Sequence, residues 1–428
     1  MELSLPRGMK DLSPDQAQGK LETIAVIEEI FKRFGFRPLE TPAMENSEVI
    51  SAKKAAGDDA IKEMYTLDDG QTSMRFDLTV PLARYVAMNK DIHMPFKRYQ
   101  IGHIWRKEEP QKMRYREFTQ ADIDTVGSRE PISDAELIAA AATALDELGI
   151  RDCTIYINDR RILEKILESY GVKGPDTNRA IRLIDKIHKI GEEQVAAQLA
   201  QTGIDSAKAR ELVEFISSGQ STAEFAERIA ANIKDAKPHI DAVLELISIV
   251  EKYSVSSKIL LDPSLARGLD YYTSFVWEFV IVDGSGRRLP SVVSGGRYDN
   301  LIEVYSKKPI PATGISIGID RLMEVLQAGT PPAHTYKRVY IAYLDHEDLA
   351  YAISFASAAR AKGVYADMNS TQRSLAKQLD YANASGVSHV VIIGKNERSA
   401  SVVRLKRLDT GSEETLGVDE AVAVLATI

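Results

Sequence analysis

Two short segments combine arginine, tyrosine and glycine in a way that suits chemistry on a small anion. The first, Ala266–Tyr272, reads Ala-Arg-Gly-Leu-Asp-Tyr-Tyr, and the second, Ser294–Asp299, reads Ser-Gly-Gly-Arg-Tyr-Asp. Both are flanked by strand-like sequence, so a guanidinium and phenol hydroxyls could approach a ligand with little side-chain bulk between them. A Gly-Gly-Arg-Tyr run alone is more often a tight turn. Two such runs, with an arginine-rich segment upstream, favour a binding site.

The arginine-rich segment, residues 97–116, carries seven lysines and arginines against two glutamates, a surplus of five positive charges. Apolar and polar residues alternate on either side of its charged centre, which predicts an antiparallel hairpin. Such a hairpin can direct several arginines toward a polyphosphate, because a guanidinium binds phosphate oxygens in pairs. Phe118, just beyond it, could stack on a base. The alternative is a solvated basic surface, the commoner explanation of a charge run on its own.

Polar side chains with strand spacing follow directly. Gln120, Asp122 and Asp124 fall on the same face of a strand, because successive side chains point to opposite faces. Three polar groups on one face suit recognition of a small polar ligand. Taken alone, a solvent-facing strand edge explains the pattern better.

Two further segments have the composition of a ligand site. In Arg75–Pro81, which predicts a strand entering a proline turn, Asp77 and Thr79 share a face. In Ala312–Leu322, a glycine-spaced strand leads into a helix that begins near Arg321. The glycines would let a planar ligand approach the backbone, and Arg321 could lie over it. Ordinary strand packing with a surface arginine is the alternative.

Several kinds of site and compartment are not indicated. The seven histidines show no metal-binding spacing, and the sequence has no Gly-x-x-x-x-Gly-Lys-Ser/Thr loop and no serine or cysteine nucleophile motif. The net charge of −8 argues against nucleic-acid binding over the whole surface. A single cysteine, Cys153, excludes an internal disulfide framework, so we expect a cytoplasmic protein with a packing role for Cys153. No apolar run is long enough to cross a bilayer, and residues 1–7 lack the layout of a secretory signal.

Capping and periodicity predict the elements that must position these residues. Ser13-Pro14-Asp15-Gln16 predicts a helix start, and Ser133-x-x-Glu136 predicts a second capped helix through Leu148. Residues 173–253 read as a helical insertion, and residues 328–334 read as a linker. Alternating strands and helices after the linker predict a small α/β domain with a largely parallel sheet. The other expected elements are strands at 36–40, 153–157, 275–282 and 313–319 and a helix at 321–327.

These elements, in this order, resemble class II aminoacyl-tRNA synthetases. Phe36–Glu45 is similar to the first motif of that class, the hairpin to the second and Gly318–Arg321 to the third. Arg267–Tyr272 and Gly295–Asp299 are more specific, because they are similar to the two signature peptides of the histidyl-tRNA synthetase family. The Gln-x-Asp-x-Asp pattern at residues 120–124 looks closer to archaeal and eukaryotic members. The resemblance covers nearly the whole chain.

The resemblance implies an α/β protein in which an α+β catalytic core on an antiparallel sheet carries a helical insertion and a small C-terminal α/β domain that binds the anticodon. The expected boundaries are 1–172 and 256–328 for the core, 173–255 for the insertion and 337–428 for the anticodon-binding domain. It also implies a cytoplasmic homodimer with no membrane association.

The implied reaction joins L-histidine to ATP, releases pyrophosphate and passes the histidyl group to the 3′ end of tRNA(His), with Mg²⁺ accompanying ATP. Arg106 and Arg267 are expected to be catalytic, because fixed cations stabilise charge that develops on the α-phosphate. The expected ATP-binding residues are Arg106, Glu108, Arg114, Phe118 and Arg321. The expected histidine-binding residues are Asp77, Thr79, Gln120, Asp124, Arg267, Tyr271, Tyr272 and Tyr298. Gln111 is expected to contact the tRNA acceptor end, and no residue is assigned as a metal ligand.

Two alternatives stay open at this point. A non-catalytic paralogue that regulates ATP phosphoribosyltransferase in histidine biosynthesis resembles the core, but typically lacks the C-terminal domain and parts of the signature peptides. This sequence keeps both. An RNA- or partner-binding protein without activity would not need Arg106, Arg267 and Arg321 together.

Overall fold

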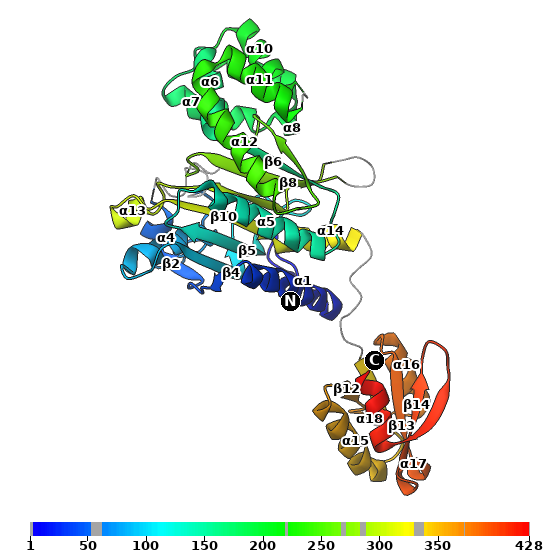
Figure 1. Ribbon diagram of the computed structural model, residues 1–428. Coiled ribbons are helices and arrows are strands. Elements are labelled where there is room, and N and C mark those ends of the chain that lie inside the picture. Colours follow the sequence, from blue (N-terminus) through cyan, green and yellow to red (C-terminus); the bar gives the residue numbers. More distant parts are fainter. Residues whose placement is uncertain are drawn as a thin grey trace. The chain divides into compact units, whose positions relative to one another are not determined.

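The computed structural model describes residues 3–52, 62–218, 221–266, 271–282, 288–328, 338–371 and 373–427. The chain forms two compact units, Met1–Pro331 and Pro332–Ile428 (Figure 1). Each unit has a hydrophobic core of its own. Across these described ranges, no helix combines the length and the apolar character that spanning a membrane requires.

An eight-stranded sheet forms the centre of the first unit, in the order β1-β4-β5-β10-β9-β8-β6-β7. Its strands are β1 Arg37–Pro38, β4 Phe96–Trp105, β5 Glu117–Val126, β6 Cys153–Asp159, β7 Lys258–Leu261, β8 Phe275–Ile281, β9 Val293–Arg297 and β10 Ala312–Gly318. Every pairing from β4 to β6 is antiparallel, whereas the two edge pairs are parallel. The expected antiparallel core sheet is therefore confirmed. Strands β2 Met44–Asn46 and β3 Thr72–Met74 form a separate antiparallel pair.

The hairpin of β4 and β5 is the longest paired element of this sheet. Its register runs from Phe96 opposite Val126 to Trp105 opposite Glu117. Because β5 also pairs with β10, the polar face of β5 lies beside strands from a distant part of the chain. The predicted hairpin and the predicted strand at residues 313–319 thus meet in one surface.

The helices that cover the core begin where local chemistry allows. They are α1 Pro14–Arg33, α2 Ser47–Ile50, α4 Thr79–Met88, α5 Pro131–Glu147, α13 Glu303–Ser306 and α14 Ile319–Ala328. The predicted capping box of α1 is present, with Ser13 and Gln16 bonded reciprocally. The predicted start of α5 at Ser133 is wrong. This helix begins at Pro131, whose fixed φ suits a first turn, and the Ser133 hydroxyl donates to Ser128 Oγ at 2.8 Å.

The segment Arg75–Pro81 is not the strand that we expected. β3 ends at Met74, and α4 begins at Thr79. Pro81 lies in the first turn of α4, where a proline costs no intrahelical hydrogen bond. Asp77 Oδ1 accepts from the Val80 backbone N–H at 2.9 Å and so satisfies one donor of that turn. Asp77 and Thr79 therefore belong to a helix start rather than to one strand face.

A group of helices occupies residues 160–251 at one end of the first unit (Figure 1). They are α6 Arg160–Ser169, α7 Pro175–Ile184, α8 Ile187–Ile190, α9 Glu192–Ala200, α10 Ser206–Ser217, α11 Thr222–Asn232, a 3₁₀ turn Lys234–Ala236 and α12 Lys237–Glu251. Arg228 lies over the rings of Phe215 and Phe225, at 4.2 and 5.0 Å from the ring centroids. The long helix α12 packs on β6 and α5, which joins this helical group to the sheet.

The second unit has a five-stranded sheet in the order β12-β11-β13-β14-β15. Its elements are β11 Arg338–Tyr343, a 3₁₀ turn His346–Asp348, α15 Leu349–Ala361, β12 Tyr365–Met368, α16 Leu375–Ala384, β13 His389–Ile393, α17 Lys395–Ser399, β14 Val402–Arg407, β15 Glu413–Gly417 and α18 Val418–Ala426. The small C-terminal α/β domain is confirmed, but its sheet is parallel only over β12, β11 and β13. The last two strands add antiparallel pairings that alternation alone did not predict.

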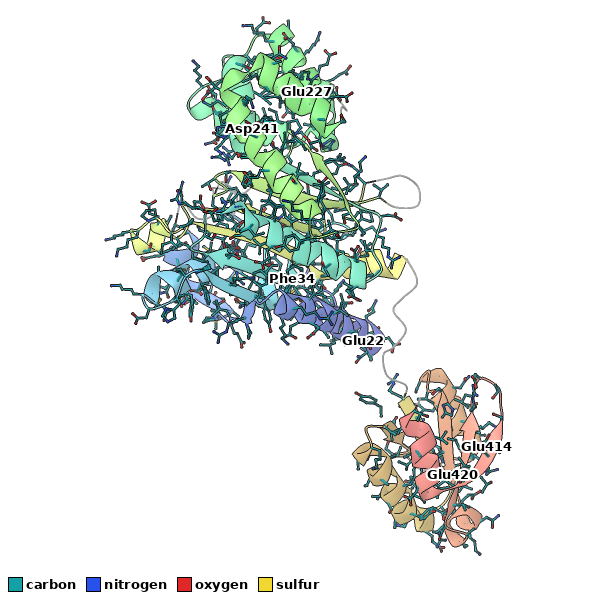
Figure 2. All side chains as sticks on the ribbon, viewed as in Figure 1. Glu22, Phe34, Glu227, Asp241, Glu414 and Glu420 are labelled. Carbon is teal, nitrogen blue, oxygen red and sulfur yellow. The ribbon has the colours of Figure 1, made fainter. Side chains whose placement is uncertain are left out.

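Charged side chains lie on the outer faces of both units. Glu227 and Asp241 are exposed on α11 and α12, and Glu414 and Glu420 are exposed in the second unit (Figure 2). The opposite faces of α11 and α12 bury residues such as Phe225 and Ile247. This is the amphipathic pattern that lets a helix pack one face on a core.

Candidate active site

A cavity of about 900 Å³ lies along β5, β8, β9 and β10 and beneath the loop that joins β4 to β5. It brings together every expected site residue that the structure describes: Asp77, Thr79, Arg106, Glu108, Gln111, Arg114, Phe118, Gln120, Asp124, Tyr271, Tyr272, Tyr298 and Arg321. Arg267, to which both a catalytic and a histidine-binding role were assigned, lies outside the described residues.

Three arginines mark one end of this cavity. Arg106 donates through Nε to the Phe76 carbonyl at 2.9 Å, and its guanidinium lies 5.3 Å from the centre of the Phe118 ring. Glu108 lies between two of these cations, 3.5 Å from Arg106 and 3.1 Å from Arg114. Opposed charges therefore fix both guanidinium groups at the entrance of the hairpin loop.

The third cation, Arg321, comes from the first turn of α14. Its Nε donates to the Met113 carbonyl at 3.0 Å, and Nη1 donates to the Ser291 carbonyl at 3.1 Å. Met113 has a φ of 64° in the turn that pairs Gln111 with Arg114. Arg321 thus ties the tip of the hairpin loop to the strand end on the opposite wall.

A segment that sequence reasoning did not connect with the site supports the same loop. The Gly8 carbonyl accepts from the Arg116 backbone N–H at 2.7 Å. Gly8 has a φ of +83°, and a Cβ on it would lie 2.8 Å from Pro110 Cγ. Glycine is therefore required by both conformation and space. Arg7 also pairs with Glu109, the acidic residue at the loop centre.

The other end of the cavity is acidic and buried. Asp124 Oδ2 lies 2.6 Å from Arg98 Nη2, and Asp124 Oδ1 accepts from the Tyr298 hydroxyl. All three side chains are buried. Burial raises the pKa of Asp124, although Arg98 and the Tyr298 hydroxyl favour the carboxylate. The pair fixes the direction of the Asp124 oxygens.

Two further carboxyl groups lie near this pair. Burial raises the pKa of Asp77 to about 6, against the opposing effects of the Val80 N–H and Arg106. Burial raises the pKa of Asp122 to about 7, and Asp124 adds to that effect while Arg98 opposes it. Asp77 Oδ2 and Asp122 Oδ1 have no hydrogen-bond partner among the described residues. This end of the cavity therefore suits a ligand that brings positive charge and N–H donors.

Tyrosines and short polar side chains complete the acidic end. The rings of Tyr271 and Tyr272 are 4.9 Å apart, and those of Tyr271 and Tyr298 are 5.9 Å apart. Burial raises the pKa of Tyr271 well above its ordinary value, although a hydrogen bond with Thr79 opposes the shift. Gln120 Nε2 donates to Ser316 Oγ at 2.6 Å. The Tyr271 hydroxyl therefore stays protonated at neutral pH and keeps its capacity to donate a hydrogen bond.

Glycines in β9 and β10 make room for these side chains. A Cβ on Gly314 would overlap the Asp124 carboxylate, and a Cβ on Gly296 would lie 2.7 Å from Tyr272 Cδ1. Gly314 therefore makes room for the Asp124 side chain and not for the planar ligand that we expected. Gly318 differs from these two glycines, because a Cβ on it would lie 3.7 Å from the nearest atom, the Val292 carbonyl oxygen.

Arg297, the arginine of the second glycine-rich run, does not line the cavity. It forms ion pairs with Asp134 of α5 and, at 3.3 Å, with Asp299, while Thr313 Oγ1 donates to Asp134 at 2.7 Å. The expectation that both runs direct a cation toward a ligand is wrong for this one. Arg297 instead holds β9 and β10 against α5, and its neighbour Tyr298 faces the cavity because side chains alternate along a strand.

The sequence did not predict Arg98 or Ser316 at the site, and it placed Asp122 on the polar strand face without assigning it to ATP or to histidine. The signal that could have found Arg98 is the register of the predicted hairpin, which places Arg98 opposite Asp124 and Gln100 opposite Asp122. Ser316 pairs with Asp122 across β5 and β10, so it could be found only once these two strands were known to be neighbours.

Comparisons with known proteins show which family the chain resembles. The family model described as Histidyl-tRNA synthetase matches residues 8–322, and the model described as Anticodon binding domain matches residues 338–428. A histidine–tRNA ligase from Korarchaeum cryptofilum is 37% identical over 424 residues, with 95% of each chain covered. A histidine–tRNA ligase from Wolinella succinogenes is 36% identical over 434 residues, covering 98% of this chain and 97% of the relative.

A crystal structure of histidyl-tRNA synthetase from Nostoc sp. has the same architecture, with a TM-score of 0.85 at 27% identity, covering 100% of this chain and 99% of that one. The resemblance that rested on short motifs is thus confirmed over the length of the sequence. On its motifs, its cavity and these matches, the chain belongs to the histidyl-tRNA synthetase family.

Proposed function

We propose that this chain activates L-histidine with ATP and transfers the histidyl group to the 3′ end of tRNA(His). In the first step a carboxylate oxygen of histidine bonds to the α-phosphorus while the bond to pyrophosphate breaks. In the second step a ribose hydroxyl of the terminal nucleotide attacks the histidyl carbonyl carbon, and AMP leaves. One observation carries the proposal: a single cavity has arginines at one end and buried carboxyl groups at the other, complementary to a triphosphate and to the ammonium group of histidine.

At the cationic end, Arg106 would meet the α-phosphate and the reacting carboxylate, and Arg267 would add a second cation. Arg114 and Arg321 would hold the outer phosphates or the face of the adenine, with Glu108 and Phe118 placing the adenosine. Preorganised cations stabilise the charge that develops on the α-phosphate more than they stabilise the ground state. The contacts of Arg106 with Phe76 and Glu108 support such preorganisation, because they hold the guanidinium before ATP arrives.

At the acidic end, Asp77, Thr79 and Gln120 would meet the α-amino and carboxylate groups of histidine. Asp124 would accept from an imidazole N–H, with Tyr271, Tyr272 and Tyr298 enclosing the ring. A site whose buried polar groups match both ring nitrogens rejects side chains that leave those groups unpaired. The double anchoring of Asp124 by Arg98 and Tyr298 supports this role.

A Mg²⁺ ion would enter the cationic end of the cavity with ATP. Glu108 is the carboxylate between Arg106 and Arg114, and carboxylate and phosphate oxygens are the ligands that Mg²⁺ prefers. Because both oxygens of Glu108 face these arginines, the phosphates of ATP would be the main ligands of the ion. When bound, the ion would neutralise negative charge on the phosphates.

Partners follow from the same proposal. Gln111, at the exposed tip of the hairpin loop, would contact the tRNA acceptor end, and residues 337–428 would form the anticodon-binding domain. The catalytic core would comprise residues 1–172 and 256–328, with the helical insertion at 173–255. We also propose a cytoplasmic homodimer, in which the first motif, around Phe36–Glu45, lies at the subunit interface.

The regulatory paralogue is the weaker explanation. The match to the anticodon-binding model over residues 338–428 supports a chain that keeps a tRNA-reading domain. The second signature peptide is present and contributes Tyr298 to the cavity.

Exchange of pyrophosphate into ATP, measured with each standard amino acid in the presence of Mg²⁺, tests the proposal. Exchange with histidine alone is the expected result, followed by charging of tRNA(His). No exchange with any amino acid from folded protein would favour the regulatory paralogue. Exchange with a different amino acid would contradict the assignment of the acidic pocket.

A further inference from the structure

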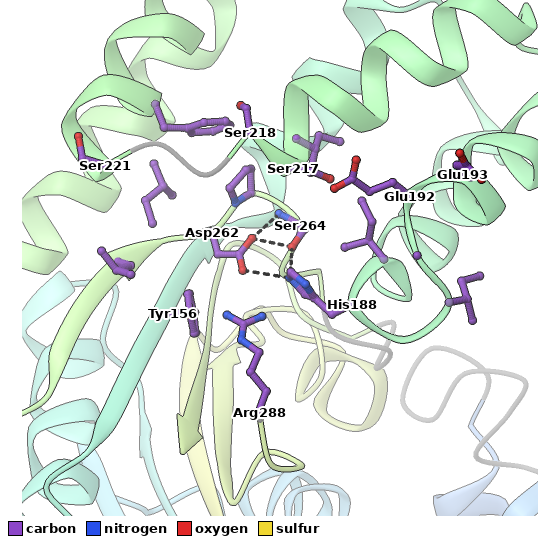
Figure 3. Close-up of a pocket in the computed structure, with 18 of the residues that line it drawn as sticks. Tyr156, His188, Glu192, Glu193, Ser217, Ser218, Ser221, Asp262, Ser264 and Arg288 are labelled. Carbon is purple, nitrogen blue, oxygen red and sulfur yellow. Dashed lines mark hydrogen bonds and ion pairs between the residues drawn. The ribbon is translucent and has the colours of Figure 1, made fainter. Parts of the chain in front are cut away.

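A second cavity, of about 1340 Å³, lies between the helical group and the edge strand β7 (Figure 3). At its floor is the turn at residues 262–266, which follows β7 and leads in sequence to Arg267. Ala266 is fully buried, and Tyr271, the next described residue, is 7% exposed. Ala266 directly precedes Arg267 in the sequence, so the contacts that hold this turn also hold the residue from which the first signature peptide continues.

The core holds the turn through Asn158 of β6. Asn158 is fully buried, and its amide Nδ2 donates to the Leu265 carbonyl at 2.9 Å and to the Pro263 carbonyl at 3.3 Å. The Asp262 backbone N–H donates to the Ile157 carbonyl at 3.0 Å, which extends the pairing of β6 and β7 into the turn. Both carbonyls bound by Asn158 lie within four residues of Arg267.

The helical group holds the same turn from the other side, through His188 of α8 (Figure 3). Ser264 Oγ donates to Asp262 Oδ1 at 2.6 Å, so it accepts from His188 Nε2, which lies 3.2 Å away. The same nitrogen is 3.6 Å from Asp262 Oδ2. Burial would favour the neutral acid, but hydrogen bonds from His188 and Ser264 lower the pKa of Asp262 below its ordinary value.

These contacts are not needed to attach the helical group, because α12 already packs on β6 and α5. The His188 side chain is 56% exposed, and it lines both this cavity and the one that holds the expected site residues. We propose that Asn158 and His188 are positioning residues that hold the turn at residues 262–266 from its two sides and act on histidine activation through Arg267. This inference rests on the proposed function.

A double-mutant cycle tests it with the full chain. Asn158→Ala is expected to lower kcat for histidine-dependent exchange roughly 100-fold, the effect of misplacing a catalytic group by about 1 Å, with KM for ATP and histidine little changed. In a chain that already carries Arg267→Ala, Asn158→Ala should lower kcat by less than about threefold further. The effects of residues that act as a unit do not add. A full 100-fold loss in both backgrounds would overturn the proposal.

His188 gives a second cycle that does not depend on a buried side chain. His188→Ala should lower kcat roughly tenfold in the wild-type background and not with Arg267→Ala. His188→Gln, which restores an N–H donor of similar reach, should recover most of the rate. Lys237→Ala, which breaks an exposed pair with Asp241 on α12, is the matched control and should leave kcat unchanged.

Equal loss with His188→Ala and His188→Gln, or additivity with Arg267→Ala, would overturn the role of His188. Thermal unfolding of each variant checks that it is folded. The two proposals fail differently. A wild-type chain without histidine-dependent exchange removes the proposed function and this inference together, whereas an active chain with additive cycles removes only the inference.

Discussion

One hydroxyl group joins the acidic end of the cavity to a buried charge pair. Tyr298 donates to Asp124, and the other oxygen of Asp124 lies 2.6 Å from Arg98. Because these side chains are buried, the carboxylate has a fixed direction and does not depend on solvent for its hydrogen bonds. What this arrangement offers a ligand is an oriented acceptor rather than simply a negative charge.

Tyr298→Phe should raise KM for histidine about tenfold or more, because it removes a hydrogen bond to a charged group worth about 1.5–3 kcal/mol. KM for ATP should stay the same, since the arginines are at the other end of the cavity. Exchange kinetics against each substrate measure the split. Tyr305→Phe is the control, because the Tyr305 hydroxyl donates to the Val49 carbonyl at 2.8 Å outside this cavity. A loss of ATP affinity in Tyr298→Phe would contradict the assignment.

The raised pKa values of Asp77, about 6, and Asp122, about 7, predict a pH dependence of ligand binding. Both lie above the ordinary value of 3.8, so the folded protein holds these protons more tightly than the unfolded chain. Without ligand, the contribution of these groups to stability is largest below about pH 4 and falls as pH rises to about 7. An ammonium ligand needs the ionised carboxylates, so the stabilisation by histidine should grow over the same window.

Melting temperatures with and without histidine, between about pH 5.5 and pH 8, measure this effect. In Asp122→Asn, the stabilisation by histidine should change less with pH around pH 7, because an amide does not titrate there. An unchanged dependence in that variant would mean that Asp122 does not exchange a proton when the ligand binds.

At the scale of elements, β5 and β10 set the width of the acidic pocket. Gly314 lies opposite Asp124 across this pair, and a side chain at Gly314 would occupy the space of the carboxylate. The neighbouring backbone cannot give way, because β10 is paired on both sides.

Gly314→Ala should therefore displace Asp124, raise KM for histidine and lower the melting temperature. Overpacking of this kind costs about 1–3 kcal/mol. Gly318→Ala, in the same strand, is the matched control and should be tolerated, because its nearest new neighbour is 3.7 Å away. If both variants bind histidine normally, the close approach at Gly314 does not matter for the pocket.

Elements that depend on neighbouring residues in the sequence could be predicted, and elements that depend on pairing with other segments could not. The start of α1 and the polar face of β5 follow from neighbouring residues, and both were predicted. The prediction of a strand at Arg75–Pro81 was wrong, because a proline after a polar run suits a loop turn and the first turn of a helix equally well. In the second unit, β14 and β15 were missed, because their pairing needs the hairpin turn between them to be recognised.

The same distinction between local and distant causes explains which site residues could be predicted. Motif spacing predicted the residues that line the cavity, because each motif carries its own strand or loop. Arg98 was counted only as part of a basic run, although it is fully buried against Asp124. Arg297 was expected at the ligand, although it pairs with Asp134 of α5. Both errors concern partners from other segments, which spacing within one segment does not contain.

At the scale of the whole molecule, the chain has two units with separate cores. All residues expected to bind ATP or histidine belong to the first, and the match to the anticodon-binding model falls in the second. Activation of histidine and reading of the tRNA should therefore be separable.

A chain that ends after Ala328 should keep histidine-dependent exchange within about threefold, because its core is complete without the second unit. Charging of tRNA(His) should fall roughly 100-fold or more. Two linked binding modules hold a shared ligand more tightly than either module alone, and the shortened chain would lose that gain in affinity for tRNA. Exchange and aminoacylation assays on the same preparation give both values. Parallel loss of the two activities would show that the second unit is needed for the first to fold or act.

Cys153 has a practical consequence for studying the two units. It is the single cysteine of the chain, it is buried, and burial raises its thiol pKa to about 12. A thiol that stays protonated and covered does not react with maleimides at neutral pH. Asp241→Cys and Glu420→Cys, at exposed positions of the first and second unit, would therefore accept a pair of fluorescent dyes with the native thiol left in place. Energy transfer between the dyes would then report the separation of the units as tRNA binds.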